Sequence, residues 1–220
     1  MAERRGGFVF FGDLVFCGIR LQEESKSYLK EKIMRAKDYR KNAWGKLKGN
    51  WTTMVIAYII MGLILGAVSF TGVGALLLTG PLTLGFSIMT LKVVRGEKPA
   101  IENLFNGISD FARSTILFIV KTIIEGLWSL LFVIPGIIAT YRHAMCFYIL
   151  KDNPEMEALD ARRASKEMMK GHKWQLFCLH FSFIGWILLS FLTFGILLFW
   201  VMPYMETANA EFYENLKNNG

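Results

Sequence analysis

Two long stretches without Asp, Glu, Lys or Arg constrain this chain more than any other feature. Residues 51–91 and residues 174–205 contain none of these four residue types. A helix needs about 20 consecutive apolar residues to cross a bilayer, because it rises about 1.5 Å per residue through about 30 Å of hydrocarbon. The sequence therefore predicts an all-α, polytopic helical membrane protein.

The composition excludes several other classes of protein. Of the 220 residues, 53% are hydrophobic and 20% are charged, which excludes a disordered chain. The 3 Cys are too widely spaced for a disulfide framework or a zinc motif. The sequence also lacks a phosphate-binding loop, a zinc-protease helix and a nucleophile elbow. We therefore expect a non-enzymatic protein without catalytic residues, metal, cofactor or nucleic-acid partner.

The distribution of Lys and Arg predicts the topology. These residues outnumber Asp and Glu in the segments 20–48, 92–113 and 142–173, and loops rich in Lys and Arg stay in the cytoplasm. Each apolar block between or after these segments is then a helical hairpin, with turns near residues 71–74, 133–136 and 193. This interpretation gives six spans in a bacterial inner membrane, with cytoplasmic N- and C-termini.

The middle block, residues 114–150, leaves an alternative topology open. It carries Lys121, Glu125 and Arg142, and a charge inside a bilayer costs about 2.5–3.5 kcal/mol on insertion scales. If these side chains stay at the interface, the block does not form a membrane hairpin. Four spans are then the alternative to six.

A weak internal repeat supports the three hairpins. A shift of 122 residues places Lys48 on Lys170 and Pro81 on Pro203. The repeats cover about 36–92, 100–151 and 154–217, within a single membrane domain of residues 34–220. Each unit combines a basic amphipathic helix, a hairpin and a proline in the returning helix. The helix bends are predicted at Pro81, Pro135 and Pro203.

The basic segments are expected to lie at the membrane surface. An amine that reaches the headgroups and a Trp ring at headgroup level both anchor a helix there. The predicted interface anchors are Lys48, Trp51, Lys170, Lys173 and Trp174. A helix is expected over residues 155–173, with Asn153 and Pro154 at its start. Its basic face either contacts anionic headgroups or is simply exposed to solvent. The expected partners are membrane lipids and a homo-oligomer or another membrane protein.

The first 33 residues are predicted to be an N-terminal extension. One interpretation is an interfacial segment, since Asp13 interrupts its apolar stretch and no signal-peptide cleavage site follows. In the other, residues 1–33 lie upstream of a natural start at Met34. The codons for Lys30 to Ile33 can resemble a ribosome-binding site.

One group of charges is a candidate for chemistry inside the membrane. If the middle hairpin turns near residues 133–136, Glu125 and Arg142 lie opposite each other at the same depth. Lys121 lies one helical turn from Glu125, a spacing that suits an ion pair. The cluster of Lys121, Glu125 and Arg142 can bind an ion or headgroup, relay a proton or lock the hairpin. His143 is expected to point away from it.

Small residues also suggest where helices approach each other. Gly62 and Gly66 have the small-x-x-x-small spacing that lets two membrane helices come close.

Several runs of residues resemble those of a known family. They are Leu47-Lys48-Gly49-Asn50-Trp51, Ile134-Pro135-Gly136-Ile137-Ile138, Asp152-Asn153-Pro154, Met168-Met169-Lys170-Gly171-His172-Lys173 and Phe183-Ile184-Gly185-Trp186. The family consists of bacterial integral membrane proteins of unknown function and is catalogued as domain of unknown function 975. The resemblance covers about residues 34–217 and implies a multi-span inner-membrane protein. It implies no activity, substrate or catalytic residue.

Two functions follow from these observations. The first is a non-enzymatic scaffold or accessory subunit of envelope or transport machinery, because catalytic motifs are lacking and basic interfacial helices are present. The second is a small transporter or lipid-handling permease that uses the Lys121, Glu125 and Arg142 cluster. Repeats with proline-broken helices and buried charges are features of transporters.

Overall fold

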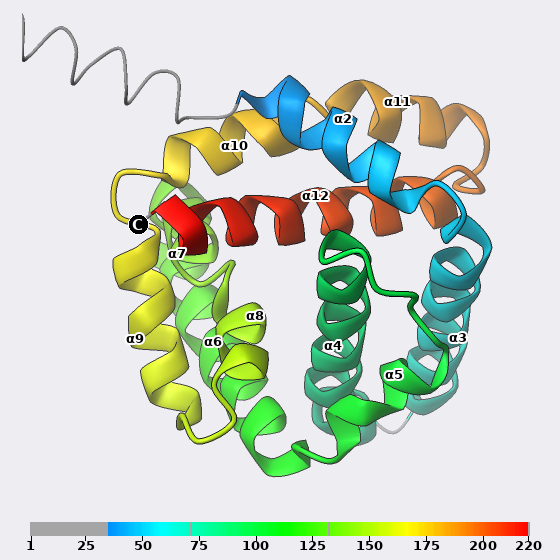
Figure 1. Cartoon of the computed structure of the whole chain (residues 1–220). Helices are drawn as coiled ribbons and strands as arrows, with labels where there is room; N and C mark the ends of the chain where they lie inside the picture. The colour runs from blue at the N-terminus through cyan, green and yellow to red at the C-terminus, as the bar shows by residue number, and fades with distance from the viewer. Residues whose placement is uncertain (1–34, 71, 132, 220) are drawn as a thin grey trace, which may run out of the picture. The chain divides into compact units, whose positions relative to one another are not determined.

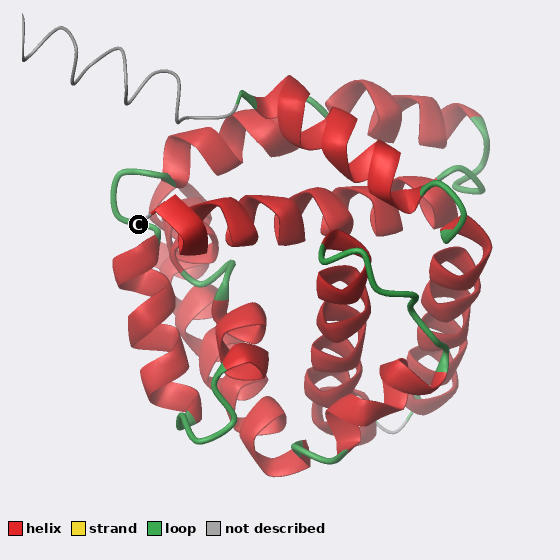
Figure 2. Cartoon of the chain, viewed as in Figure 1, coloured by secondary structure: helices red, strands yellow, loops and turns green. Residues whose placement is uncertain are grey.

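A computed structural model describes residues 35–70, 72–131 and 133–219, which contain helices and no strand (Figure 2). The predicted all-α class is confirmed for these residues. The predicted extension, residues 1–33, lies outside them, so both interpretations of that segment stay predictions.

The helices follow the composition of each segment. Uncharged stretches form α3 and α4, and short basic segments form α2 and α9. Glycines with positive φ at Gly49, Gly72 and Gly96 lie at the ends of these helices, where other residues would be strained. The elements are α2 (Ala36–Leu47), α3 (Trp51–Ser69), α4 (Val73–Val94), α5 (Glu102–Phe105), η1 (Asn106–Ile108), α6 (Phe111–Leu131), α7 (Val133–Arg142), α8 (Cys146–Asp152), α9 (Ala158–Met168), α10 (Lys173–Phe181), α11 (Ile184–Leu192) and α12 (Leu198–Asn219).

Three helical segments among the described residues are long and apolar enough to cross a membrane. They are Trp51–Ser69, Gly74–Val94 and Lys173–Leu192, the last of which joins α10 and α11. These segments are consistent with a membrane protein. The middle block is not among them, because α6 carries Lys121 and Glu125 and α7 has 10 residues. Six spans and four spans both stay predictions.

The breaks between α3 and α4 and between α11 and α12 lie close to the predicted first and third turns. Gly72 separates α3 from α4, within the predicted turn at residues 71–74. The third turn includes Phe194 and Gly195, both with positive φ. This turn delays the start of α12 to Leu198, five residues after the predicted position at Thr193.

Pro81 and Pro203 lie inside helices, and Pro135 lies in the first turn of α7. Because Pro81 has no N–H, it leaves the carbonyl of Leu77 without its helical donor. The hydroxyl of Thr115 in α6 donates to this carbonyl at 3.1 Å. The proline therefore provides a contact between two helices, which the sequence interpretation as a simple bend did not include.

The positions at which backbones approach each other closely differ from the predicted Gly62 and Gly66. A Cβ at Gly62 or Gly66 would meet nothing within 4 Å. A Cβ at Gly85 would instead overlap the carbonyl of Leu104, and one at Gly107 the carbonyl of Pro81. The spacing of Gly62 and Gly66 is common in apolar helices. It cannot identify which glycines face a neighbour within the chain.

The short amphipathic helices pack on helices from other parts of the chain (Figure 1). Helix α2 packs on α12, α5 packs on α4, and α9 packs on α8. Helix α4 also packs against both α8 and α12. In each case the helix that begins one predicted repeat covers the last helix of a different one. This pattern is compatible with three related units, but the repeat itself stays a prediction.

Helix α9 differs from its prediction at the N-terminus. It begins at Ala158 after Glu157, not at Asn153. The Asn153 amide donates to the Ile149 carbonyl at 2.9 Å, so it caps the preceding helix α8 instead. Ala158, Ala161 and Ser165 are buried, and α9 packs on α8 and α6. The face of α9 that carries these three residues is therefore covered by protein.

Candidate functional site

A polar cavity of about 370 Å³ lies among the apolar helices. Side chains from α4, α6, α7, α8, α10 and α12 line it. This set of residues is called the polar cavity below. Its polar lining consists of Thr83, Ser87, Lys121, Thr140, Tyr141, Tyr148, His180, Glu206 and Asn209.

His180 is held in place by two hydrogen-bonding neighbours. Its Nε2 lies 2.9 Å from Oδ1 of Asn209, and its Nδ1 lies 3.3 Å from the hydroxyl of Tyr141. Because Asn209 Oδ1 can only accept, Nε2 donates to it, while Nδ1 shares its hydrogen bond with the Tyr141 hydroxyl. The sequence showed His180 alone in an apolar stretch. Its partners come from α12 and α7, which only the folded chain brings together.

Glu206 brings a carboxylate to the wall of the polar cavity. The Tyr148 hydroxyl donates to Oε2 of Glu206 at 3.2 Å. Within the part of the chain that the structure describes, Glu206 forms no ion pair. Glu206 is half-buried, and a carboxylate that is partly removed from water and forms no ion pair favours the approach of a positive charge.

Lys121 joins the polar cavity to the predicted charge cluster. Its Nζ lies 4.0 Å from Oε1 of Glu125, at the i, i+4 spacing expected from the sequence. The same ammonium lies 5.7 Å from the centre of the Phe147 ring, a cation–π distance. Lys121 is therefore both a lining residue of the cavity and the partner of Glu125.

The structure places His143, and not Arg142, next to Glu125. The Nδ1 of His143 lies 3.7 Å from Oε1 of Glu125, and the His143 side chain is 4% exposed. Among the described residues Arg142 forms no ion pair; its carbonyl accepts from the Ser165 hydroxyl at 3.0 Å. The expected direction of His143 assumed a continuous helix. Helix α7 ends at Arg142, and the turn that follows directs His143 toward α6.

The predicted interface anchors divide into half-buried and exposed positions. Trp51 begins α3 and packs edge-on against Trp44, with ring centres 5.0 Å apart, so it also belongs to an aromatic cluster. Trp174 is 71% exposed near the start of α10. Lys48 is exposed, Lys173 is half-buried, and Lys170 pairs with Glu167.

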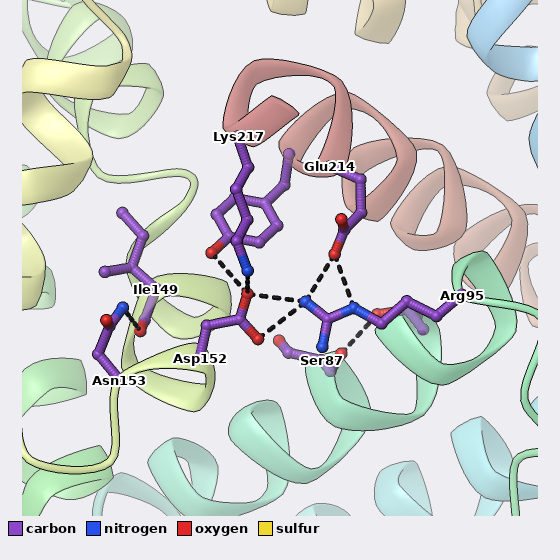
Figure 3. A network of polar contacts seen from close by, with 9 residues as sticks. Ser87, Arg95, Ile149, Asp152, Asn153, Glu214 and Lys217 are labelled. Carbon is purple, nitrogen blue, oxygen red and sulfur yellow. Dashed lines mark hydrogen bonds and ion pairs between the residues drawn. The ribbon is translucent and has the colours of Figure 1, made fainter. Parts of the chain in front are cut away.

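A network of charges joins the ends of α4, α8 and α12, and the sequence did not predict it (Figure 3). Arg95 donates to both carboxylate oxygens of Asp152 at 2.7 and 2.8 Å, and it lies 2.6 Å from Glu214. Lys217 and the Tyr213 hydroxyl donate to Asp152 at 2.5 and 3.0 Å. We call these five residues the ionic network.

The ionic network changes the protonation of its members. Burial alone would raise the pKa of Asp152, but the hydrogen bonds from Arg95 and Lys217 outweigh it and hold that pKa below its ordinary value. Burial and the nearby Asp152 carboxylate raise the pKa of Tyr213. Asp152 is therefore a carboxylate and Tyr213 a neutral donor at physiological pH.

The ionic network reaches the polar cavity through two tyrosines. Tyr213 stacks on Tyr148, with ring centres 5.4 Å apart, and Tyr148 lines the cavity. The shift of 122 residues that defines the repeat also relates Arg95 to Lys217 and Ser87 to Asn209. In the first pair both side chains bind Asp152, and in the second both line the polar cavity, so this shift is a signal that could have identified these residues from the sequence.

Comparison with known proteins identifies a family and no solved relative. The family model described as "Protein of unknown function (DUF975)" matches residues 34–140 and 130–220. This match confirms the resemblance found in the sequence. No curated protein and no solved structure matches the chain.

Proposed function

This chain belongs to the family described as proteins of unknown function (DUF975), which brings no activity with it, and we propose from its geometry that it is a small, non-enzymatic membrane transporter. In this proposal the polar cavity holds a polar solute within the membrane, and the ionic network lies at one end of α4, α8 and α12, which are three of the helices that line the cavity. The chain would be an integral protein of a bacterial inner membrane with cytoplasmic termini.

The polar cavity is the observation that carries the proposal. Its walls include Lys121, His180 and Glu206; His180 lies in a candidate span, and the other two lie on α6 and α12, which pack against the span α4. Ionisable side chains are expensive inside a membrane and usually mark substrate or ion pathways. Its volume of about 370 Å³ falls within the range of small-molecule sites, about 300–1,000 Å³.

The cavity also removes one objection to transport by so short a chain. A chain of 220 residues is short for a transporter, and several copies would be needed if one chain could not enclose a path for a solute. Helices α4, α7, α8 and α12 of one chain contribute to the walls of the polar cavity. One chain therefore supplies a solute-sized space without a second copy, although a homo-oligomer is compatible with it.

The competing proposal is a scaffold or accessory subunit. It is favoured by the weak burial of α3 and of the α10–α11 segment, of which 17% and 22% are buried within the chain. These surfaces fit lipids or the helices of a membrane partner equally well. The exposed Arg163 and Lys166 of α9 suit anionic headgroups in either proposal.

Thiol accessibility distinguishes the two proposals. In a variant without Cys17, Cys146 and Cys178, single cysteines replace Thr83 and Asn209, which line the polar cavity. A transporter exposes its site to both sides in turn, so we expect a small cationic methanethiosulfonate to label both cysteines from outside in cells and from inside in inverted vesicles.

A matched control comes from the same helix. Leu84 neighbours Thr83 but is 1% exposed and does not line the cavity, so Leu84→Cys should stay unlabelled from either side. If Thr83→Cys and Asn209→Cys are labelled from one side or from none, the transporter proposal is wrong. The scaffold proposal then takes its place.

A further inference from the structure

Two buried polar atoms next to the polar cavity lack hydrogen-bond partners among the described residues. They are Oε1 of Glu125 and Nδ1 of His143. These atoms lie 3.7 Å apart, slightly beyond hydrogen-bond distance, and face each other. The His143 side chain is 96% buried, since only 4% of it is exposed. A buried polar group left unpaired costs free energy, so this pair favours a proton that both atoms can share.

One proton would satisfy both atoms. When the imidazole is neutral with its hydrogen on Nε2, a lone pair on Nδ1 faces the carboxylate, and two acceptors cannot bond to each other. A proton bound at Nδ1 gives an imidazolium that donates to Glu125. The bond is then charge-assisted, which makes it shorter and stronger than a neutral one. No metal site competes with this reading, because the described residues contain no cluster of three metal-binding side chains.

The charges around the pair come from three helices. Lys121 of α6 pairs with the same Glu125 oxygen at 4.0 Å. Arg162 of α9 interacts electrostatically with Cys146 of α8, as Lys121 and Glu125 do, and its Nε is a further buried atom without a hydrogen-bond partner among the described residues. Because a guanidinium stays protonated, Arg162 contributes the same charge before and after proton uptake. Lys121 is the side chain that can change its partner.

Lys121 connects this pair to a second carboxylate. It lines the polar cavity together with Glu206, which has no cation as a partner among the described residues. While Lys121 neutralises Glu125, the cavity keeps the negative charge of Glu206 and attracts a cation. When an imidazolium replaces Lys121 at Glu125, the released ammonium offsets Glu206 instead.

We propose that Glu125 and His143 form a proton-binding site, and that proton uptake there expels a cation from the polar cavity by releasing Lys121. The inference rests on the proposed function, because it requires a solute site in the cavity. The proton comes from water and forms an N–H bond at Nδ1 of His143. One positive charge enters as one leaves, so the net charge of the pair and the polar cavity together is the same in both states. The solute class is a small cation, such as an amine.

Calorimetry on the full chain in lipid nanodiscs tests this exchange. Methylammonium chloride and potassium chloride are the probes, in buffers of different ionisation enthalpy, between about pH 5 and pH 9. We expect about one proton to be released per cation bound. Because proton binding and cation binding affect each other reciprocally, the affinity for the cation should fall by up to about tenfold for each pH unit toward acid.

Three variants separate the parts of the inference. Glu206→Gln should lose cation binding, whereas His143→Gln should bind the cation without releasing a proton. His172→Gln is the matched control, because His172 pairs with Gln175 and does not line the cavity. It should keep both the affinity and the proton release.

A second measurement needs no change in the cluster. The chain has 3 His, so ¹⁵N-histidine spectra of the unsubstituted protein can be assigned with His172→Gln and His180→Gln. Addition of the cation should move the His143 nitrogen signals toward those of neutral imidazole.

Each negative result would contradict a different part of the inference. Cation binding without proton release and without a change at His143 overturns the proton linkage, while the proposed function stands. If neither probe binds, the cation assignment is wrong. Two-sided labelling of Thr83→Cys and Asn209→Cys would still support transport in that case. One-sided or absent labelling overturns the proposed function itself.

Discussion

Asp152 illustrates how individual residues hold this chain together. Its side chain is 8% exposed and is approached by Arg95, Lys217 and Tyr213. These partners come from α4 and α12, more than 50 residues away in either direction. A buried carboxylate with several charge-assisted hydrogen bonds stabilises a fold mainly because removing its charge leaves its partners unpaired.

We expect Asp152→Asn to lower the free energy of unfolding by about 1–3 kcal/mol, the range for lost hydrogen bonds to charged groups. Tryptophan fluorescence during thermal unfolding in detergent measures the change. Asp160→Asn is the matched control, because its pair with Arg163 is 52% and 73% exposed and should matter little. Equal unfolding temperatures for the two variants would contradict the role assigned to the ionic network.

The same carboxylate makes stability depend on pH. Because its pKa is lowered in the folded chain from an ordinary 3.8, Asp152 stabilises the fold above that value. The contribution is lost as pH falls through the lowered pKa. In Asp152→Asn this part of the acid dependence should be missing. The difference in stability between the two proteins should therefore shrink below about pH 4.

At the scale of elements, the close contacts of helix α4 with its neighbours depend on its glycines and its proline. Pro81 frees a carbonyl that Thr115 then occupies, and Gly85 admits the backbone of Leu104. The segment that includes α5 and η1 packs closely along α4 because these positions have no side chain or no N–H. Such contacts cannot be inferred from hydropathy, since any apolar residue would keep the hydropathy pattern.

Gly85→Ala should be strongly destabilising, by about 2–5 kcal/mol, because the added methyl overlaps a backbone carbonyl that cannot move independently. Gly62→Ala is the matched control on α3, where an added Cβ meets nothing within 4 Å. It should be neutral or slightly stabilising, since Ala favours a helix. The yield of monodisperse protein and the unfolding temperature report both changes. Equal behaviour of the two variants would be incompatible with the close approach at Gly85.

At the scale of the whole molecule, the packing of the helices creates the polar cavity. Helices α4, α8 and α12 meet, and α2, α5 and α9 each cover one of them. The cavity therefore depends on contacts between all three predicted repeats. Its lining side chains would lie apart if any one repeat were removed.

The number of spans is tested by thiol labelling in intact cells. Single cysteines at Gly72, Ile134 and Thr193 mark the three predicted turns, and Lys98→Cys marks the predicted cytoplasmic side. For six spans we expect an impermeant maleimide to label all three turns. Lys98→Cys should react only after permeabilisation. Labelling of Gly72→Cys and Thr193→Cys without Ile134→Cys would exclude a middle hairpin and indicate four spans.

The sequence by itself determined the class of this protein. Uncharged stretches of sufficient length, glycines at helix ends and runs of residues shared with one family are local features, so they can be read without a structure. The i, i+4 pair of Lys121 and Glu125 was predictable for the same reason, because a single helix fixes that distance.

Only the tertiary structure decided which distant residues meet. The partner of Glu125 was expected to be Arg142 and is His143, because the end of α7 changes the direction of the next side chain. Glu206, Asn209 and the ionic network gave no local signal, since their partners lie on other helices. The period of apolar residues and the spacing between charged residues describe one helix at a time. The polar cavity exists because several helices pack together, and packing is a property of the whole chain.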